Sequence, residues 1–378
     1  MKEQITFLSN CSGDGSEQQP YAAADGTAGI QAALDALSAH GGALHLPAAR
    51  YELTKTLLLS LSGSCIQGDV WACNTDPNGV FETAYGTKLR LRGRGFPAVR
   101  IGGSHVVSGC LLRELGLQAD LVGMDTREQF DAASPTANAG LVLDEVRTDQ
   151  CTFDRLSFCG FGAGIAVTGQ AEVDACKFQD CNLDGCGVGV YFAPRASYYT
   201  RIHRCAIADN PYYGVFVDVR GKHMHNLEIT ENLFVRNGGA LVGDAPEQAA
   251  VSLLGVSNCA IERNVFDDPG LFWYYPPTAT ENRAHQPQKR QMPALYIGGH
   301  RNRIRDNVFE HSRGPAVIVC GDGNVLMNNI SDGDVVIAGQ GNYIANLAFT
   351  SPDARLILTE KASDTQIFGV DKERIRRL

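Results

Sequence analysis

The sequence predicts an all-β protein, a single-stranded right-handed parallel β-helix with an N-terminal capping helix. Three observations support this prediction. A short apolar motif repeats along the chain, an asparagine recurs at one position of that motif, and one amphipathic helical segment precedes the repeats. Repeats with a period of about 20 to 50 residues are typical of stacked architectures.

The repeated motif is a short apolar strand that runs into a turn. Its copies at 229–234, 261–266, 304–309 and 326–330 align without gaps, and looser copies lie at 173–178 and 202–207. Each copy is joined to a second apolar strand, and these strands lie at 164–167, 189–192, 214–217, 250–253, 294–297, 316–319 and 334–337. The shortest spacing, from Ile304 to Leu326, is too small for a strand-helix-strand unit, which needs about 30 residues. A coil of parallel strands fits this spacing.

One position of the motif is polar although it should face inward. It is occupied by Cys176, Cys205, Asn232, Asn264, Asn307 and Asn329. An inward amide at a turn can bond to its copies on neighbouring rungs, about 4.8 Å away, so that no buried polar group lacks a partner. We interpret these residues as an internal ladder and not as a functional site.

The N-terminal region predicts a cap on the open end of the coil. Asp25-Gly26-Thr27 should start a helix through Ile30, Leu34 and Leu37, followed by a strand at 43–47. We expect one domain over 1–378. It divides into a cap and first rung (1–60), stacked rungs (61–349) with insertions near 118–138, 236–249 and 267–293, and a last rung with a C-terminal cap (350–378).

This N-terminal pattern resembles a known family. The stretches Asp25-Gly-Thr, Ile30-Gln-Ala-Ala-Leu34, Gly41-Gly-Ala-Leu-His-Leu-Pro47 and Tyr51-Glu-Leu53 resemble the opening of the pectate-lyase-like β-helix superfamily of carbohydrate-active proteins. Ala49 replaces the glycine usual there, and the Asp-Thr stretch is short. The resemblance covers roughly 20–370 and implies the fold; the superfamily includes lyases, hydrolases, epimerases and phage tailspikes.

A narrower similarity is to inulin fructotransferases and difructose-anhydride hydrolases, in the run from Gly214 to Gly270. That similarity implies a homotrimer with sites between subunits.

Composition excludes several classes of partner. The net charge of −9 argues against nucleic acid, and no apolar run reaches the roughly 18 to 20 residues that span a bilayer. The first residues lack a secretory signal, which predicts a cytoplasmic protein, or a secreted or periplasmic one if the N-terminus has been trimmed. The 12 cysteines form no CxxC pair and are expected to be free thiols, with a zinc site at Cys176, Cys181 and Cys186 disfavoured.

The outward residues of the second strand predict a sugar-binding surface. Tyr191, Phe216 and Tyr296 fall in one outward row, and flat aromatic faces match the C–H faces of sugar rings. Trp273 and Tyr274 lie in the neighbouring insertion and could extend the surface. The alternative is that a loop simply buries these rings.

The candidate catalytic acids lie beside this row. Asp218 is the one acid of the next outward row, and Glu247 or Asp244 in the adjacent insertion could supply a second carboxylate. Glycosidases place two carboxyl groups about 5 to 9.5 Å apart. Arg195 and Arg220 flank Asp218, so a purely structural ion pair is the alternative.

Three functions follow from these candidates. The first is an enzyme that cleaves or transfers glycosidic bonds of an oligo- or polysaccharide by paired carboxylates, without a cofactor. The second is a polysaccharide lyase or uronate epimerase that uses Arg195, Arg220 and His300, with calcium at an acidic segment containing Asp120, Asp125, Arg127, Glu128 and Asp131. The third is a non-catalytic sugar-binding or tailspike-like protein. No metal site is expected for the first function.

Overall fold

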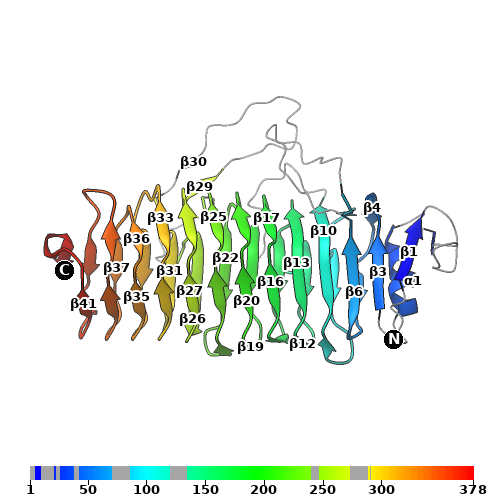
Figure 1. Cartoon of the computed structure of the whole chain (residues 1–378), viewed down its shortest axis with the longest axis horizontal. Coiled ribbons are helices and arrows are strands. Elements are labelled where there is room, and N and C mark those ends of the chain that lie inside the picture. Colours follow the sequence, from blue (N-terminus) through cyan, green and yellow to red (C-terminus); the bar gives the residue numbers. More distant parts are fainter. Residues whose placement is uncertain are drawn as a thin grey trace.

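A computed structural model describes residues 5–9, 21–22, 26–37, 42–69, 86–119, 134–239, 247–272, 288–289 and 291–378. These residues wind into an elongated stack of rungs, with the first and last elements at opposite ends (Figure 1). Each complete rung has three short strands, and each strand pairs in parallel with its counterpart on the next rung. The prediction of an all-β parallel β-helix is confirmed.

The third strand of each rung belongs to a 12-stranded sheet. Its strands are β5 (Leu57–Leu59), β8 (Val99–Ile101), β11 (Ala139–Leu143), β14 (Ala163–Val167), β18 (Val188–Phe192), β22 (Tyr213–Asp218), β26 (Val251–Ser257), β31 (Leu295–His300), β34 (Val317–Val319), β37 (Val335–Ile337), β40 (Leu356–Leu358) and β42 (Ile375–Arg377). The candidate site residues that the structure describes lie on this sheet and in the loops that enter or leave it.

The first and second strands of the rungs join in a 23-stranded sheet, because β10 and β13 run through both positions. First strands are β3 (Gly42–Leu46), β6 (Ser64–Gly68), β10 (Leu111–Ala119), β13 (Thr152–Cys159), β16 (Lys177–Gln179), β20 (Arg201–His203), β24 (Glu228–Thr230), β27 (Ala260–Glu262), β32 (Arg303–Arg305), β35 (Val325–Met327), β38 (Tyr343–Ala345) and β41 (Gln366–Phe368). Second strands are β4 (Arg50–Leu53), β7 (Lys88–Leu91), β17 (Asn182–Asp184), β21 (Ala206–Ala208), β25 (Leu233–Val235), β28 (Val265–Asp267), β33 (Val308–Glu310), β36 (Ile330–Ser331) and β39 (Ala348–Phe349).

Smaller elements complete the described chain. A five-stranded sheet contains β9 (Val107–Ser108), β12 (Arg147–Asp149), β15 (Glu172–Asp174), β19 (Ala196–Tyr198) and β23 (His223–His225). The remaining elements are β1 (Ile5–Ser9), β2 (Tyr21–Ala22), α1 (Gly26–Leu37), the antiparallel pair β29 (Leu271–Phe272) and β30 (Gln288–Lys289), and the 3-10 turn η1 (Lys372–Arg374). The segments 120–133, 240–246 and 273–287 lie outside the described residues, and they make up about half or more of each predicted insertion.

The interior of the coil is apolar because alternate residues of each short strand point inward. Phe234, Phe266 and Phe309 lie on successive rungs with ring centroids 4.8 and 4.7 Å apart, and each is 1% exposed. One continuous cluster of buried apolar residues extends from Ile30 in α1 to Ala362 near the end of the chain. Stacking of like residues on like residues thus builds the core rung by rung.

The asparagine ladder is present at the turn between first and second strands. Asn264 donates its side-chain amide to the Asn307 Oδ1 at 3.0 Å and to the Ile229 carbonyl at 2.9 Å, and accepts from the Asn232 backbone at 2.9 Å. The predicted position of Cys176 in this ladder is wrong. Phe178 pairs with Ile202, so that Cys181 occupies the ladder position next to Cys205.

Two further ladders exist that the motif alignment did not predict. Asn302 and Asn324 are linked at 3.0 Å in the turn before the first strands. Asn210 and Asn237 are linked at 2.9 Å in the turn before the 12-stranded sheet. Buried polar residues at all three corners therefore hold the rungs in register.

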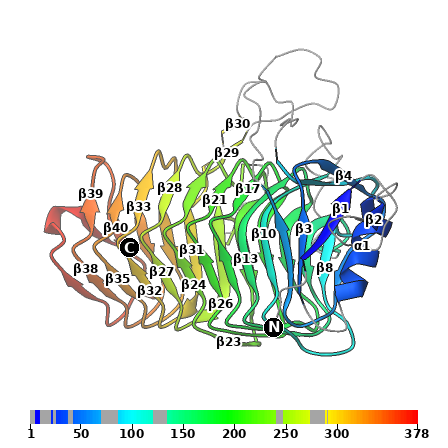
Figure 2. The ribbon, with the colours of Figure 1, turned by 45° about the vertical axis from the view of Figure 1, so that its right-hand side comes forward.

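The helix α1 lies against the N-terminal end of the coil, as Figure 2 shows, and its predicted role as a cap is confirmed. Its apolar residues Ile30, Ala33 and Leu37 are at most 1% exposed, and it contacts β3, β4 and β5. The Thr27 hydroxyl accepts a hydrogen bond from the Thr54 backbone at 2.7 Å, which joins the helix to the end of β4. Asp25, the predicted cap residue, lies outside the described residues.

The ten cysteines within the described ranges are free thiols, as the sequence predicts. Burial is the main reason why the pKa of the Cys259 thiol rises to about 11. Such thiols act as small apolar side chains and are poor nucleophiles. Within the described residues, no helix is long and apolar enough to cross a bilayer.

Candidate functional site

The aromatic row lies on the outer wall of the 12-stranded sheet. Tyr191 pairs with Phe216, Phe216 with Ser252, and Ser252 with Tyr296, so the three rings share one register position. The centroids of the Tyr191 and Phe216 rings are 5.7 Å apart, and the rings are stacked within 23°. The predicted alignment of the three rings on one exterior wall is therefore present.

These rings are less exposed than an open sugar platform would be. Tyr191 is 9% exposed and Tyr296 is 8% exposed. Phe216 is partly buried, and its ring centroid lies 4.6 Å from that of Tyr213. The apolar side chains on this wall form two clusters, one that contains Tyr191 and one that contains Tyr296, and both are separate from the core of the coil. The wall thus exposes only a small part of Tyr191 and Tyr296, which is less than a sugar ring stacked on an open aromatic face would need.

Asp218 follows this row at the end of β22. Arg220 donates to it through Nη2 at 2.6 Å and through Nε at 2.9 Å, and the Arg220 backbone N–H lies 3.3 Å from the same carboxylate. These hydrogen bonds hold the pKa of Asp218 below its ordinary value. Asp218 is therefore ionised at neutral pH, which suits a nucleophile or a base.

Glu247 enters the same neighbourhood from the loop before β26. Burial, followed by the Glu247 charge, raises the pKa of Tyr213 to about 12. Glu247 also contributes to the raised pKa of Tyr296, after burial and a hydrogen bond with Cys320, and it raises the pKa of Arg220 after Asp218 does. Arg220 thus bonds Asp218 directly and also feels the charge of Glu247, so Glu247 lies in the same neighbourhood as Asp218.

Ser252 is the residue of this site that sequence reasoning missed. It lies between Phe216 and Tyr296 in the row, is 0% exposed, and its hydroxyl forms no hydrogen bond among the described residues. Buried hydroxyl groups almost always have partners. The signal in the sequence was one serine in a row whose other members are aromatic or aliphatic.

The other predicted residues lie elsewhere or outside the described chain. Arg195 forms an ion pair with Glu172, and His300 accepts a hydrogen bond from the Asp322 backbone at 3.0 Å. Asp244, Trp273 and Tyr274 lie outside the described residues, as does the acidic segment from Asp120 to Asp131. The arginines and the histidine of the lyase hypothesis therefore each contact a different acidic residue.

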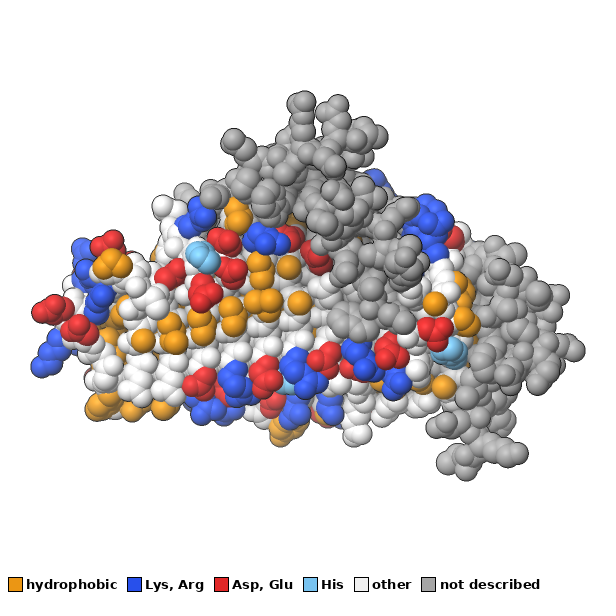
Figure 3. Space-filling view, turned by 45° about the horizontal axis from the view of Figure 1, so that its top comes forward, with side chains coloured by type: hydrophobic (Ala, Val, Ile, Leu, Met, Phe, Trp, Pro, Cys, Tyr) orange, Lys and Arg blue, Asp and Glu red, His pale blue; other side chains and the backbone are white. Residues whose placement is uncertain are grey.

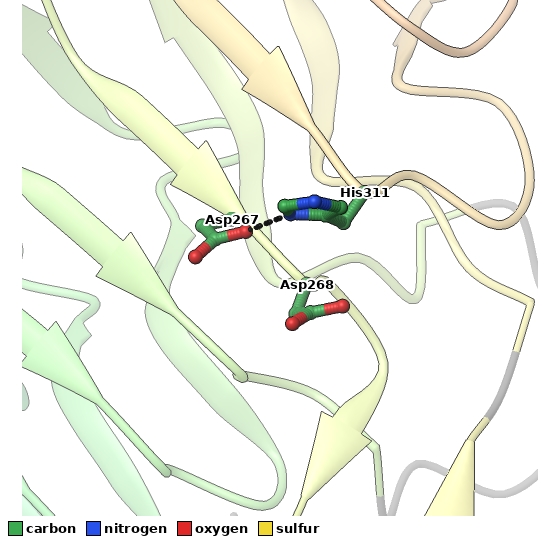
Figure 4. A group of neighbouring side chains, drawn as sticks. All are labelled: Asp267, Asp268 and His311. Atoms are coloured by element: carbon green, nitrogen blue, oxygen red, sulfur yellow. Dashed lines mark hydrogen bonds and ion pairs between the residues drawn. The ribbon is translucent and has the colours of Figure 1, made fainter.

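A group with metal-ligating side chains lies at another corner. Asp267, Asp268 and His311 place one ligand atom each within 4.8 Å of one another (Figure 4). The His311 Nδ1 lies 2.7 Å from Asp267, and Arg313 lies 3.7 Å from Asp268. Hydrogen bonding to Asp267 raises the pKa of His311, with smaller contributions from Asp268 and Asp332. With all three of its side chains already paired, the group is an ion-pair network at the ends of β28 and β33.

The chain matches the model of one protein family. The family is described as the right-handed β-helix region, and it matches residues 136–266 and 163–350, together more than half of the chain. The chain belongs to the right-handed β-helix family. No curated protein matches it in sequence.

Solved structures of similar fold add to this right-handed β-helix assignment. DFA-IIIase from Arthrobacter chlorophenolicus A6, without its lid and in complex with GF2, is 13% identical with a TM-score of 0.68, over 100% of this chain and 99% of that one. A second DFA-IIIase structure with GF2 is 12% identical with a TM-score of 0.69, over 93% and 91%. ORF18 of Geobacillus virus E2 is 11% identical with a TM-score of 0.50, over 96% and 59%. At these identities the likeness concerns the fold.

Proposed function

We propose that this β-helix protein cleaves or transfers glycosidic bonds of an oligo- or polysaccharide, with Asp218 and Glu247 as its two carboxylates. The observation that supports this most directly is the position of Arg220, which is influenced by both carboxylates beside Tyr191 and Tyr296. Two carboxylates next to aromatic rings are the groups that glycosidic bond cleavage uses. The solved DFA-IIIase structures with bound GF2 share the fold over nearly the whole chain and point to the same class of ligand.

The two carboxylates would have different roles. Asp218 is held ionised by Arg220, so it would attack the anomeric carbon or activate a water molecule. Glu247 would protonate the oxygen of the leaving group. If Asp218 is the nucleophile, Glu247 would regain its proton from the water that hydrolyses the intermediate; if Asp218 is the base, Asp218 would release the water proton to solvent and Glu247 would be reprotonated from solvent. Ser252 would accept or donate a hydrogen bond to a sugar hydroxyl, which would satisfy its buried oxygen.

The lyase alternative needs free cations to neutralise a uronate carboxylate. Arg195, Arg220 and His300 are each engaged with an acid of the protein, and Arg220 is held by Asp218 through two side-chain nitrogens. Because each of these cations is already balanced by an acid, they leave no excess positive charge for a substrate carboxylate. The carboxylate pair is therefore the better supported chemistry.

Activity on a panel of neutral and acidic oligosaccharides, including GF2 and DFA-III, tests the proposal. We expect Asp218→Asn and Glu247→Gln each to lower kcat by about 100-fold to 10,000-fold, the usual contribution of general acid–base groups. Asp322→Asn is the matched control, because Asp322 is an exposed acid that follows β34, three strands along the same sheet from β22, and is paired with His300.

Three outcomes would contradict the proposal. Growth of ultraviolet absorbance on acidic glycans would indicate elimination and the lyase class. Sugar binding without any turnover would indicate a non-catalytic protein. Equal activity of Asp218→Asn and the control would remove Asp218 from the site.

A further inference from the structure

A groove lies on another wall of the coil than the Asp218–Glu247 site, along the outer face of the first strands. It has a volume of about 450 Å³ and spans β16, β20, β24, β27 and β32. The side chains that line it are Lys177, Gln179, Arg201, His203, Arg204, Glu228, Thr230, Ala260, Glu262, Arg263 and Arg303. The Asp218–Glu247 site does not contribute to it.

The hollow arises from one short side chain in a column of long ones. In register along the rungs, the column reads Lys177, Arg201, Glu228, Ala260 and Arg303. Ala260 leaves a gap between Glu228 and Arg303 that a longer side chain would fill. Its neighbours on either side are fixed by parallel strand pairing, so the gap persists.

A single buried carboxylate organises the arginines around this gap. The Glu262 side chain is 8% exposed and lies 2.8 Å from Arg305, 3.5 Å from Arg303 and 3.5 Å from Arg263. The three arginine side chains remain 40%, 53% and 49% exposed. One negative charge therefore orients three guanidinium groups that still face solvent.

The groove is positively charged although the protein carries a net charge of −9. Arg201 is paired with Glu228 at 2.8 Å, Arg204 with Asp180 at 2.6 Å and Arg263 with Glu231 at 2.9 Å. Figure 3 shows acidic and basic side chains alternating in a row along the coil. The excess comes from Lys177, which has no acidic partner among the described residues, and from Arg303 and Arg305, which share Glu262.

We propose that this groove is a second binding site, for the carboxylate or sulfate groups of an anionic saccharide segment. Guanidinium groups that are already oriented bind such anions with charge-assisted hydrogen bonds. Five rungs at about 4.8 Å extend over roughly 20 Å, which suits several sugar units and not a single small anion. No aromatic side chain other than His203 lines the groove, so it lacks the rings on which nucleic-acid bases stack.

Calorimetric titration with three probes tests the site: trigalacturonate, a sulfated heparin tetrasaccharide and a neutral oligosaccharide of equal length. We expect at least one anionic probe to bind, with affinity that falls as salt rises. Ala260→Glu places a negative charge in the gap and should weaken this binding tenfold or more. Gln366→Glu is the matched control, because Gln366 is exposed and lies farther along the same column.

A second variant guards against misfolding. Arg303→Ala should weaken the same binding while the thermal unfolding curve stays that of the wild type, since Arg303 is 53% exposed. Asp218→Asn should leave the affinity unchanged, which separates this site from the proposed catalytic one.

The proposal is overturned if neither anionic probe binds or if Ala260→Glu and Gln366→Glu bind equally. It is also overturned if inorganic sulfate or a single-stranded oligonucleotide binds better than both anionic saccharides. A preference between trigalacturonate and the heparin fragment would identify the anionic group.

Discussion

Individual residues in this protein have properties that depend on their neighbours, both within a rung and between rungs. Asp218 is kept ionised by Arg220, and Tyr191 has a raised pKa because it is buried near Asp218. Ser252 keeps an unpaired buried hydroxyl between two aromatic side chains. An apolar residue of similar size at this position would avoid the cost of burying a polar atom without a hydrogen-bond partner.

Replacing Ser252 separates stability from function. Ser252→Ala removes an unsatisfied buried oxygen, so the free energy of unfolding should stay equal or rise by up to about 1 kcal/mol. If the hydroxyl contacts substrate, KM should rise by about tenfold. Thermal unfolding and steady-state kinetics on the same preparation measure both effects. A variant with unchanged KM would leave Ser252 without a role in binding.

The pKa of His311 gives a prediction about pH. Because Asp267 raises the His311 pKa above 6.5, the folded state binds this proton more tightly than the unfolded state. The interaction should stabilise the fold fully below pH 6.5, and its contribution should disappear as pH rises through the raised pKa. An NMR titration should show the raised value, and Asp267→Asn should bring it back towards 6.5.

Among the secondary-structure elements, the corner ladders connect strands that each contain only three or so residues. Such short strands make few hydrogen bonds of their own, so the buried amides supply much of the specificity of register. Asn264 has two donors and one acceptor engaged on both neighbouring rungs.

Removing one rung of the ladder should be costly. Asn264→Ala removes the side-chain partner of the Ile229 carbonyl and of the Asn232 amides, while the Asn307 Oδ1 keeps only its bond from the Asn264 backbone, so we expect a loss of about 3 kcal/mol. Gln340→Ala, at an exposed amide, should change stability by less than about 0.5 kcal/mol. Urea unfolding measures both. Similar midpoints for the two variants would argue against a stabilising ladder.

For the molecule as a whole, stability comes from stacking of like residues and not from covalent cross-links. All ten described cysteines are free. Several of them contact a backbone carbonyl of the preceding rung through Sγ, as Cys176 does with Thr148 at 3.3 Å. Each rung contacts its neighbours, and α1 closes one end of the stack.

Reductant should therefore have no effect on thermal stability. The melting temperature with and without dithiothreitol should agree within about 1 °C, since loss of a disulfide would cost about 2 to 5 kcal/mol. Differential scanning calorimetry under both conditions measures this. A drop of several degrees in reductant would show that cross-links contribute.

The sequence by itself determined the coil, its capping helix, the inward asparagines and the outward row of Tyr191, Phe216 and Tyr296, because periodicity and alternation are local properties of the chain. Only the tertiary structure decided which rungs are neighbours across loops of unequal length. Asn264 meets Asn307 across 43 residues, while Asn307 meets Asn329 across 22. Strand pairings of that kind put Cys181 and not Cys176 in the ladder, and they set Ala260 beside Arg303 in the groove on the first strands. They also bring Glu247 into the neighbourhood of Arg220.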